Sequence, residues 1–85
     1  EDDYRLIKTL KVLAQSDNTK VASIACFDLG EFARIHPRGR DILQQTSAKT
    51  VLIGLMSASK NADVQKQALF AIQKLMVKKF DMIAQ

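Results

Sequence analysis

The sequence predicts an all-α fold of about two helical repeats, with five helices stacked as a short right-handed solenoid fragment. Apolar residues recur at helical spacing along most of the chain. Three glycines and one proline are few for a fold of strands and tight turns, so helices joined by short loops are favoured. The chain also repeats itself at the spacing that separates Ser16 from Ser59. At that spacing Ser16, Asn18, Val21, Ala25 and Phe27 align with Ser59, Asn61, Val64, Ala68 and Phe70.

A repeat of about 40–47 residues is typical of HEAT and armadillo arrays, whose stacked helices present a surface to other proteins. A short helix ahead of a longer pair is an armadillo trait, but one example leaves both repeat types open. About three repeats are normally needed for a stable array. We therefore expect residues 1–85 to form a single helical-repeat domain whose neighbours lie in the rest of a longer protein.

Two helices are expected in the first half of the chain, over residues 3–15 and 19–36, with Pro37 ending the second. Their apolar stripes are Leu6, Ile7, Leu10, Leu13 and Ala14 in the first and Val21, Ala25, Leu29, Phe32 and Ala33 in the second. The polar loop 16–19 between them is expected to end in a helix N-cap. Gly30 costs a helix interior about 1 kcal/mol relative to alanine, and we favour close helix packing over plain tolerance as its explanation.

Three more helices are expected, over residues 41–45, 48–58 and 63–83. Thr46-Ser47 offers a cap for the middle one, and the loop 59–63 repeats the earlier loop and cap. The apolar residues of the last two are Val51, Leu52, Leu55 and Met56, then Val64, Ala68, Ile72, Leu75 and Met76, flanked by Leu69 and Phe80. The last helix is apolar over more than half its circumference, so it is expected to pack on two neighbours.

Few residues could carry chemistry. His36 has no second histidine or cysteine cluster at metal-ligand spacing, so a structural or surface role is expected. Cys26 is expected to be a small buried hydrophobe, because no base is placed to activate it. The chain has neither a nucleophile elbow nor a glycine-rich phosphate loop. We expect no catalytic, cofactor-binding or metal-binding residues.

Asp28 and Glu31 share one face of the second expected helix. A carboxylate pair could do acid–base chemistry, but it would need a cleft that raises one pKa. Glu31 also precedes Arg34 by three residues, a spacing that forms surface ion pairs. A structural face is therefore the favoured interpretation, and partner contact is the second.

The net charge of +4 comes from scattered basic residues rather than from a block. Arg38, Arg40, Lys78 and Lys79 could meet phosphates, but no aromatic residues interleave with them, so no nucleic acid is expected. No apolar run reaches the roughly 18 residues of a membrane span, and the acidic start is no secretory signal, so no direct membrane insertion is expected. A single cysteine is compatible with a reducing cytoplasmic compartment.

Three blocks resemble the C-terminal domain of the H subunit of the vacuolar-type proton-translocating ATPase (V-ATPase). They are Cys-Phe-Asp-Leu-Gly-Glu-Phe at 26–32, His-Pro-Arg-Gly-Arg at 36–40 and Gln-Ala-Leu-Phe-Ala-Ile-Gln-Lys-Leu-Met-Val at 67–77. Their combination in this order is specific, and the resemblance covers about residues 10–80. Phe27 stands where the family usually has histidine. Residues 46–48 replace glycines, and residues 78–81 replace a His-Asn-Trp-Glu type of ending.

The resemblance implies a regulatory, non-catalytic domain that couples ATP hydrolysis to proton pumping and inhibits hydrolysis by the detached soluble sector. Its partners would be the stator, the membrane-side collar and central rotor elements, on the cytosolic face of vacuolar or endosomal membranes. The alternative is an armadillo-type adaptor that binds peptides of other proteins, although such adaptors usually present tryptophans and this chain has none. The expected partner-binding residues are Asp28, Glu31, Arg34, Arg38, Arg40, Lys74, Lys78 and Lys79.

Overall fold

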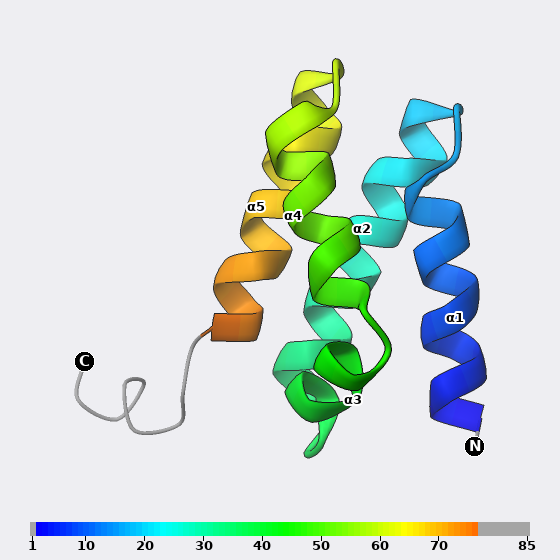
Figure 1. The fold of residues 1–85 in the computed structure, drawn as a ribbon, viewed down its shortest axis with the longest axis vertical. Helices are drawn as coiled ribbons and strands as arrows, with labels where there is room; N and C mark the ends of the chain where they lie inside the picture. The colour runs from blue at the N-terminus through cyan, green and yellow to red at the C-terminus, as the bar shows by residue number, and fades with distance from the viewer. Residues whose placement is uncertain (1, 77–85) are drawn as a thin grey trace.

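The computed structural model describes residues 2–76 as five helices joined by short loops (Figure 1). The helices are α1 (Asp2–Ala14), α2 (Thr19–Ile35), α3 (Gly39–Gln45), α4 (Ala48–Ala58) and α5 (Ala62–Met76). Residues 2–76 contain no strand. The all-α prediction is therefore confirmed, and the arrangement is consistent with an armadillo- or HEAT-like fragment. The right-handed stacking stays a prediction, and the expected extension of the last helix over 77–83 lies outside the described residues.

Helix α2 lies between α1 and α5 and packs most extensively against α5, while α4 covers another side of α5 (Figure 1). The last helix therefore packs on two neighbours, as its wide apolar surface predicts. Helix α3 begins at Gly39, two residues earlier than expected. The backbone N–H of Gly39 donates to the carbonyl of His36 at 2.9 Å, which starts the helical turn directly after Pro37.

The helix caps reproduce the sequence repeat in atomic detail. Asn18 Oδ1 accepts from the backbone amides of Lys20 and Val21, each at 3.1 Å, and Ser16 Oγ accepts from the amide of Asn18 at 3.0 Å. One repeat later, Asn61 Oδ1 accepts from the amide of Val64 at 3.0 Å, and Ser59 Oγ accepts from the amide of Asn61 at 3.2 Å. These bonds satisfy amides at the start of α2 and α5, so both predicted caps are confirmed.

The predicted cap at Thr46-Ser47 is wrong. Ser47 is the N-cap residue of α4, but it lies in the left-handed region with φ 65° and its side chain makes no cap hydrogen bond. Thr46 Oγ1 instead donates to the carbonyl of Ile42 at 2.8 Å, at the end of α3. Only two residues separate α3 from α4. The chain passes from α3 to α4 through a left-handed residue, which takes the place of the extended backbone of an ordinary cap.

The core is built from apolar residues of all five helices. Its buried members are Ile7, Leu10, Ala14, Ala25, Cys26, Leu29, Ala33, Ile42, Leu43, Ala48, Leu52, Ala68, Ala71 and Leu75. The predicted stripes were too wide at their edges, since Leu6, Leu13, Leu69 and Met76 are 39–55% exposed. Helices α1 and α5 are each covered by neighbours on part of their circumference only, so the flanks of their apolar stripes face outward.

Close approach of α2 and α5 explains Gly30. A Cβ added there would lie 2.9 Å from Ala71 Cα and 3.1 Å from Ala71 Cβ, which is closer than side chains pack. Two facing small residues let the two backbones approach, so the packing explanation for Gly30 is confirmed. Gly39 is similarly restricted, because a Cβ there would overlap the carbonyl oxygen of Phe32 and lie 2.8 Å from Ala33 Cα.

Candidate functional site

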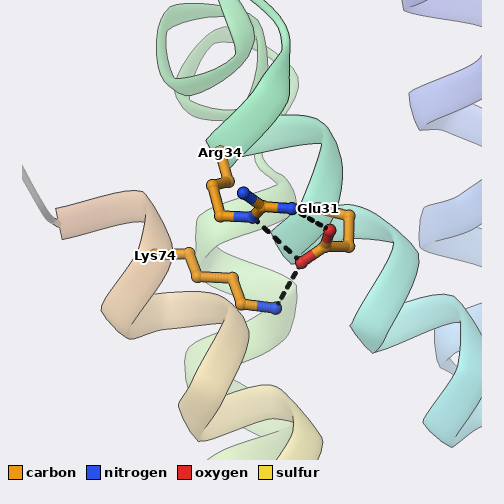
Figure 2. A network of polar contacts seen from close by, with 3 residues as sticks. All are labelled: Glu31, Arg34 and Lys74. Carbon is orange, nitrogen blue, oxygen red and sulfur yellow. Dashed lines mark hydrogen bonds and ion pairs between the residues drawn. The ribbon is translucent and has the colours of Figure 1, made fainter.

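The central polar feature is a three-residue cluster that joins α2 to α5 (Figure 2). Glu31 accepts from two nitrogens of Arg34, at 2.6 Å from Nη2 and 3.3 Å from Nε, and from Lys74 Nζ at 2.7 Å. Glu31 and Lys74 occupy the same position in successive repeats, since they are 43 residues apart. The stacking of α2 on α5 therefore brings these two equivalent positions together, where they carry opposite charges.

The cluster holds Glu31 in its ionised form. Hydrogen bonds from Arg34 and then from Lys74 lower the pKa of Glu31 from 4.5 to about 2, and Glu31 in turn raises the pKa of the Arg34 guanidinium. This shift is opposite to the raised pKa that a carboxylate needs to act as a general acid near neutral pH. The geometry therefore suits an electrostatic link between helices or a charged contact surface.

An apolar hollow of about 220 Å³ lies close to the cluster, between α2 and α5. It is lined by Ser23, Ile24, Phe27 and Gln67. Lys74 Nζ lies 4.7 Å from the centroid of the Phe27 ring, a cation–π contact, so Phe27 joins the hollow to the charged cluster. Sequence reasoning did not place Phe27 in a site. Its departure from the family pattern and its repeat in Phe70 were the available signals.

The turn after α2 is fixed by His36. Its Nδ1 accepts from the amide of Arg38 at 3.0 Å, so Nε2 carries the ring proton when the ring is neutral and lies 2.9 Å from Asp3 Oδ2. The ring also stacks on Phe32 at a centroid distance of 4.7 Å. These contacts tie the end of α2 to the start of α1. The structural role predicted for His36 is confirmed.

The predicted partner-binding residues fall into separate groups. Glu31, Arg34 and Lys74 come together in the cluster. Asp28 is exposed on α2, and Arg38 and Arg40 lie at the α2–α3 turn, Arg38 exposed and Arg40 partly buried. Lys78 and Lys79 lie outside the described residues.

A second hollow, of about 500 Å³, lies between α1 and α2. It is lined by Leu6, Leu10, Asp28, Glu31, Phe32, Ile35, His36 and Pro37. In the sequence repeat, Asp28 and Phe32 of α2 are equivalent to Ala71 and Leu75 of α5. Both of these α5 residues are buried, and Ala71 packs directly against Gly30 of α2. The α2 surface of this hollow is therefore equivalent to the surface of α5 on which α2 packs.

Cys26 is fully buried, and burial raises the pKa of its thiol to about 11. A thiol in this environment is a packing group rather than a nucleophile, which confirms the prediction for Cys26. Residues 2–76 also contain no group of three or more His, Cys, Asp or Glu placed to hold a metal ion. Within the same residues, no helix is both long and apolar enough to cross a membrane.

Comparison with known proteins identifies the family. A model of the V-ATPase H-subunit family matches residues 1–80. The chain belongs to this family. It is 37% identical over 78 residues to the V-type proton ATPase H subunit of Drosophila melanogaster, covering 91% of this chain and 16% of that protein. With the Dictyostelium discoideum H subunit it shares 41% identity over 83 residues, covering 95% of this chain and 18% of the relative.

A probable V-type proton ATPase H subunit of Oryza sativa subsp. japonica is 34% identical over 76 residues, covering 88% of this chain and 17% of that protein. The chain thus spans less than a fifth of the length of these relatives. No solved structure matches the chain significantly. The family match favours an H-subunit domain over the armadillo-type adaptor.

Proposed function

We propose that the chain is a regulatory, non-catalytic domain of a V-ATPase. In this role it couples ATP hydrolysis to proton pumping in the assembled enzyme and inhibits hydrolysis by the detached soluble sector. The observation that carries the proposal is the match to the H-subunit family over residues 1–80. The relatives that share 34–41% identity with the chain are named as V-type proton ATPase subunits.

The proposed mechanism is mechanical. A domain that restrains parts moving past one another must resist deformation, and α2 and α5 are joined in two ways that provide this stiffness. Gly30 and Ala71 bring their backbones into close contact, and Glu31 links Lys74 to Arg34. Interiors packed in this way have low compressibility and transmit strain. The α2–α5 pair is therefore the part of the domain that we propose carries load.

The proposed partners are stator, collar and central rotor elements of the same enzyme, and the proposed location is the cytosolic face of vacuolar or endosomal membranes. We also propose that residues 1–85 belong to the C-terminal domain of a longer helical array. The hollow between α1 and α2 supports this, because the equivalent surface of α5 is covered by another helix of the array. The α2–α3 turn is the proposed site of partner specificity, since the repeat does not duplicate it.

ATP hydrolysis by a soluble V-ATPase sector prepared without its H subunit tests the proposal. Adding the chain should lower the hydrolysis rate in a saturable way. Arg38→Glu should weaken this inhibition, because the exposed Arg38 presents its charge at the proposed contact. Lys60→Glu is the matched control, since it reverses the charge of an exposed residue in the α4–α5 loop. Unchanged hydrolysis at saturating, folded chain would contradict the proposed function, and equal effects of the two variants would remove the turn from the contact.

A further inference from the structure

We propose that the hollow between α2 and α5 holds an apolar side chain of an assembly partner, and that Arg34 pairs with a carboxylate beside that side chain. The inference rests on the proposed function, because it assumes that the domain binds other polypeptides. It adds the surface and the chemistry of the partner segment. That segment carries a large apolar residue with an aspartate or glutamate close to it.

Exposed apolar residues gather at this face. Ile24 and Phe27, which line the hollow, are 56% and 47% exposed. Grouped apolar residues that remain in water mark interaction surfaces. Aromatic residues also contribute strongly when a partner buries them.

The charge of the adjoining cluster indicates an acidic partner. Glu31, Arg34 and Lys74 carry two positive charges and one negative charge. The guanidinium of Arg34 has five N–H donors, and its bonds to Glu31 use two of them. The Arg34 side chain is 54% exposed, whereas those of Glu31 and Lys74 are 24% and 25% exposed. Arg34 therefore has both the charge and the donors to bind a further carboxylate in the planar geometry that guanidinium groups favour.

Two other candidates fit less well. A second copy of the chain docking through the same face would bring two positively charged clusters together, which disfavours that contact. The larger hollow, between α1 and α2, lies on the surface of α2 that is equivalent to a helix-packing surface of α5. It therefore suits a neighbouring helix of the array better than a side chain of a partner. The α2–α5 face differs because it retains the exposed ring of Phe27, which contacts the charged cluster through Lys74, after the two helices have packed.

Binding of the chain to the soluble V-ATPase sector lacking its H subunit provides the main test. Phe27→Ser should weaken binding about tenfold, as expected for an aromatic residue buried at an interface. Phe27→Leu, which keeps an apolar side chain, should lose less than about threefold. Ile53→Ser on α4 removes a similarly exposed apolar residue and should have no effect. Circular dichroism checks that each variant is folded. Equal binding by Phe27→Ser and wild type overturns the proposal.

A peptide library displayed on phage and selected on the wild-type chain separates this inference from the proposed function. Selected peptides should combine a large apolar residue with a nearby carboxylate, and their binding should fall in Phe27→Ser and in Arg34→Glu. Selection of basic peptides, or binding that neither variant affects, overturns the inference. If such peptides bind as expected while wild type fails to bind the ATPase sector, the proposed function fails and the chemistry of the hollow stands.

Discussion

Two glycines in helix interiors provide a direct test of the α2–α5 packing. Gly30 lies in α2 against Ala71, whereas Gly54 lies in α4, where an added Cβ meets nothing within 4 Å. Replacing either glycine by alanine removes the same backbone-entropy cost and should stabilise a helix by about 0.5–1 kcal/mol. Any difference between the two variants therefore measures the space around Gly30.

The contacts at Gly30 set the size of that difference. The new Cβ would lie 2.9 Å from Ala71 Cα, a backbone atom that cannot rotate away. Helix α5 must shift outward, and overpacking of this kind costs about 1–3 kcal/mol. We expect Gly54→Ala to be more stable than wild type by about 0.5–1 kcal/mol and Gly30→Ala to fall below Gly54→Ala by about 1–3 kcal/mol.

Urea unfolding followed by circular dichroism measures both free energies, and an unchanged denaturant slope verifies that the same surface unfolds in each variant. For a domain of this size 1 kcal/mol corresponds to about 4–8 °C in Tm, so thermal melts provide a second readout. The reasoning is refuted if Gly30→Ala gains as much stability as Gly54→Ala, because the two helices would then not be in close contact.

Three further predictions follow from single residues. Because the fold lowers the pKa of Glu31 from 4.5 to about 2, the contribution of Glu31 to stability is present above about pH 4.5 and is lost as the pH falls toward 2. The Tm of Glu31→Gln should therefore fall less steeply over this pH range than the Tm of wild type. Identical Tm profiles would contradict the pKa shift. Native Cys26, buried and with a raised pKa, should react with Ellman's reagent at pH 8 about 100-fold more slowly than in urea, since labelling requires local opening; comparable rates would show that the thiol is accessible. Asn18→Ala and Asn61→Ala should each cost about 1 kcal/mol in urea unfolding, and a loss confined to one of them would refute the equivalence of the two caps.

Local signals explain what could be predicted from the sequence. Helix spans follow from apolar spacing, and the caps at Asn18 and Asn61 follow from short polar side chains ahead of each apolar run. Gly30 was interpretable because an interior glycine needs a reason, and close packing in a helical array supplies one. These features depend on residues near one another in the chain, or on a pattern that the chain repeats.

Features that depend on which neighbours cover a helix were missed. Leu6 and Leu13 belong to the apolar stripe of α1, yet they are 47% and 39% exposed because no neighbour covers that flank. Ser47 was predicted as a cap, but in the two-residue connection between α3 and α4 it has a left-handed conformation and its side chain makes no cap hydrogen bond. The hollow beside Phe27 arises only when α2 and α5 pack. None of these outcomes is encoded in residue type or local spacing.

The pairing of Glu31 with Lys74 was missed for a different reason. Glu31 and Lys74 occupy equivalent positions of the two repeats, and the stacking of α2 on α5 brings this pair together. A sequence repeat is recognised by the positions at which its two copies carry the same residue. Glu31 and Lys74 differ, so this pair gave no repeat signal. In a stacked array, identical charges at equivalent positions would repel across the interface, so an ion pair there requires the two repeats to diverge.

The same reasoning applies to the outer side of α5. Gly30 lets α5 approach α2, but its repeat equivalent on α5 is Gln73, an exposed residue with a long side chain. A helix shaped like α5 could not approach α5 at that position as closely as α5 approaches α2. Any element that packs there must lie farther out or offer a hydrogen-bonding partner to the Gln73 amide. The identities between the repeats thus build the scaffold, while the differences at Gly30 and Glu31 determine how each helix face is used.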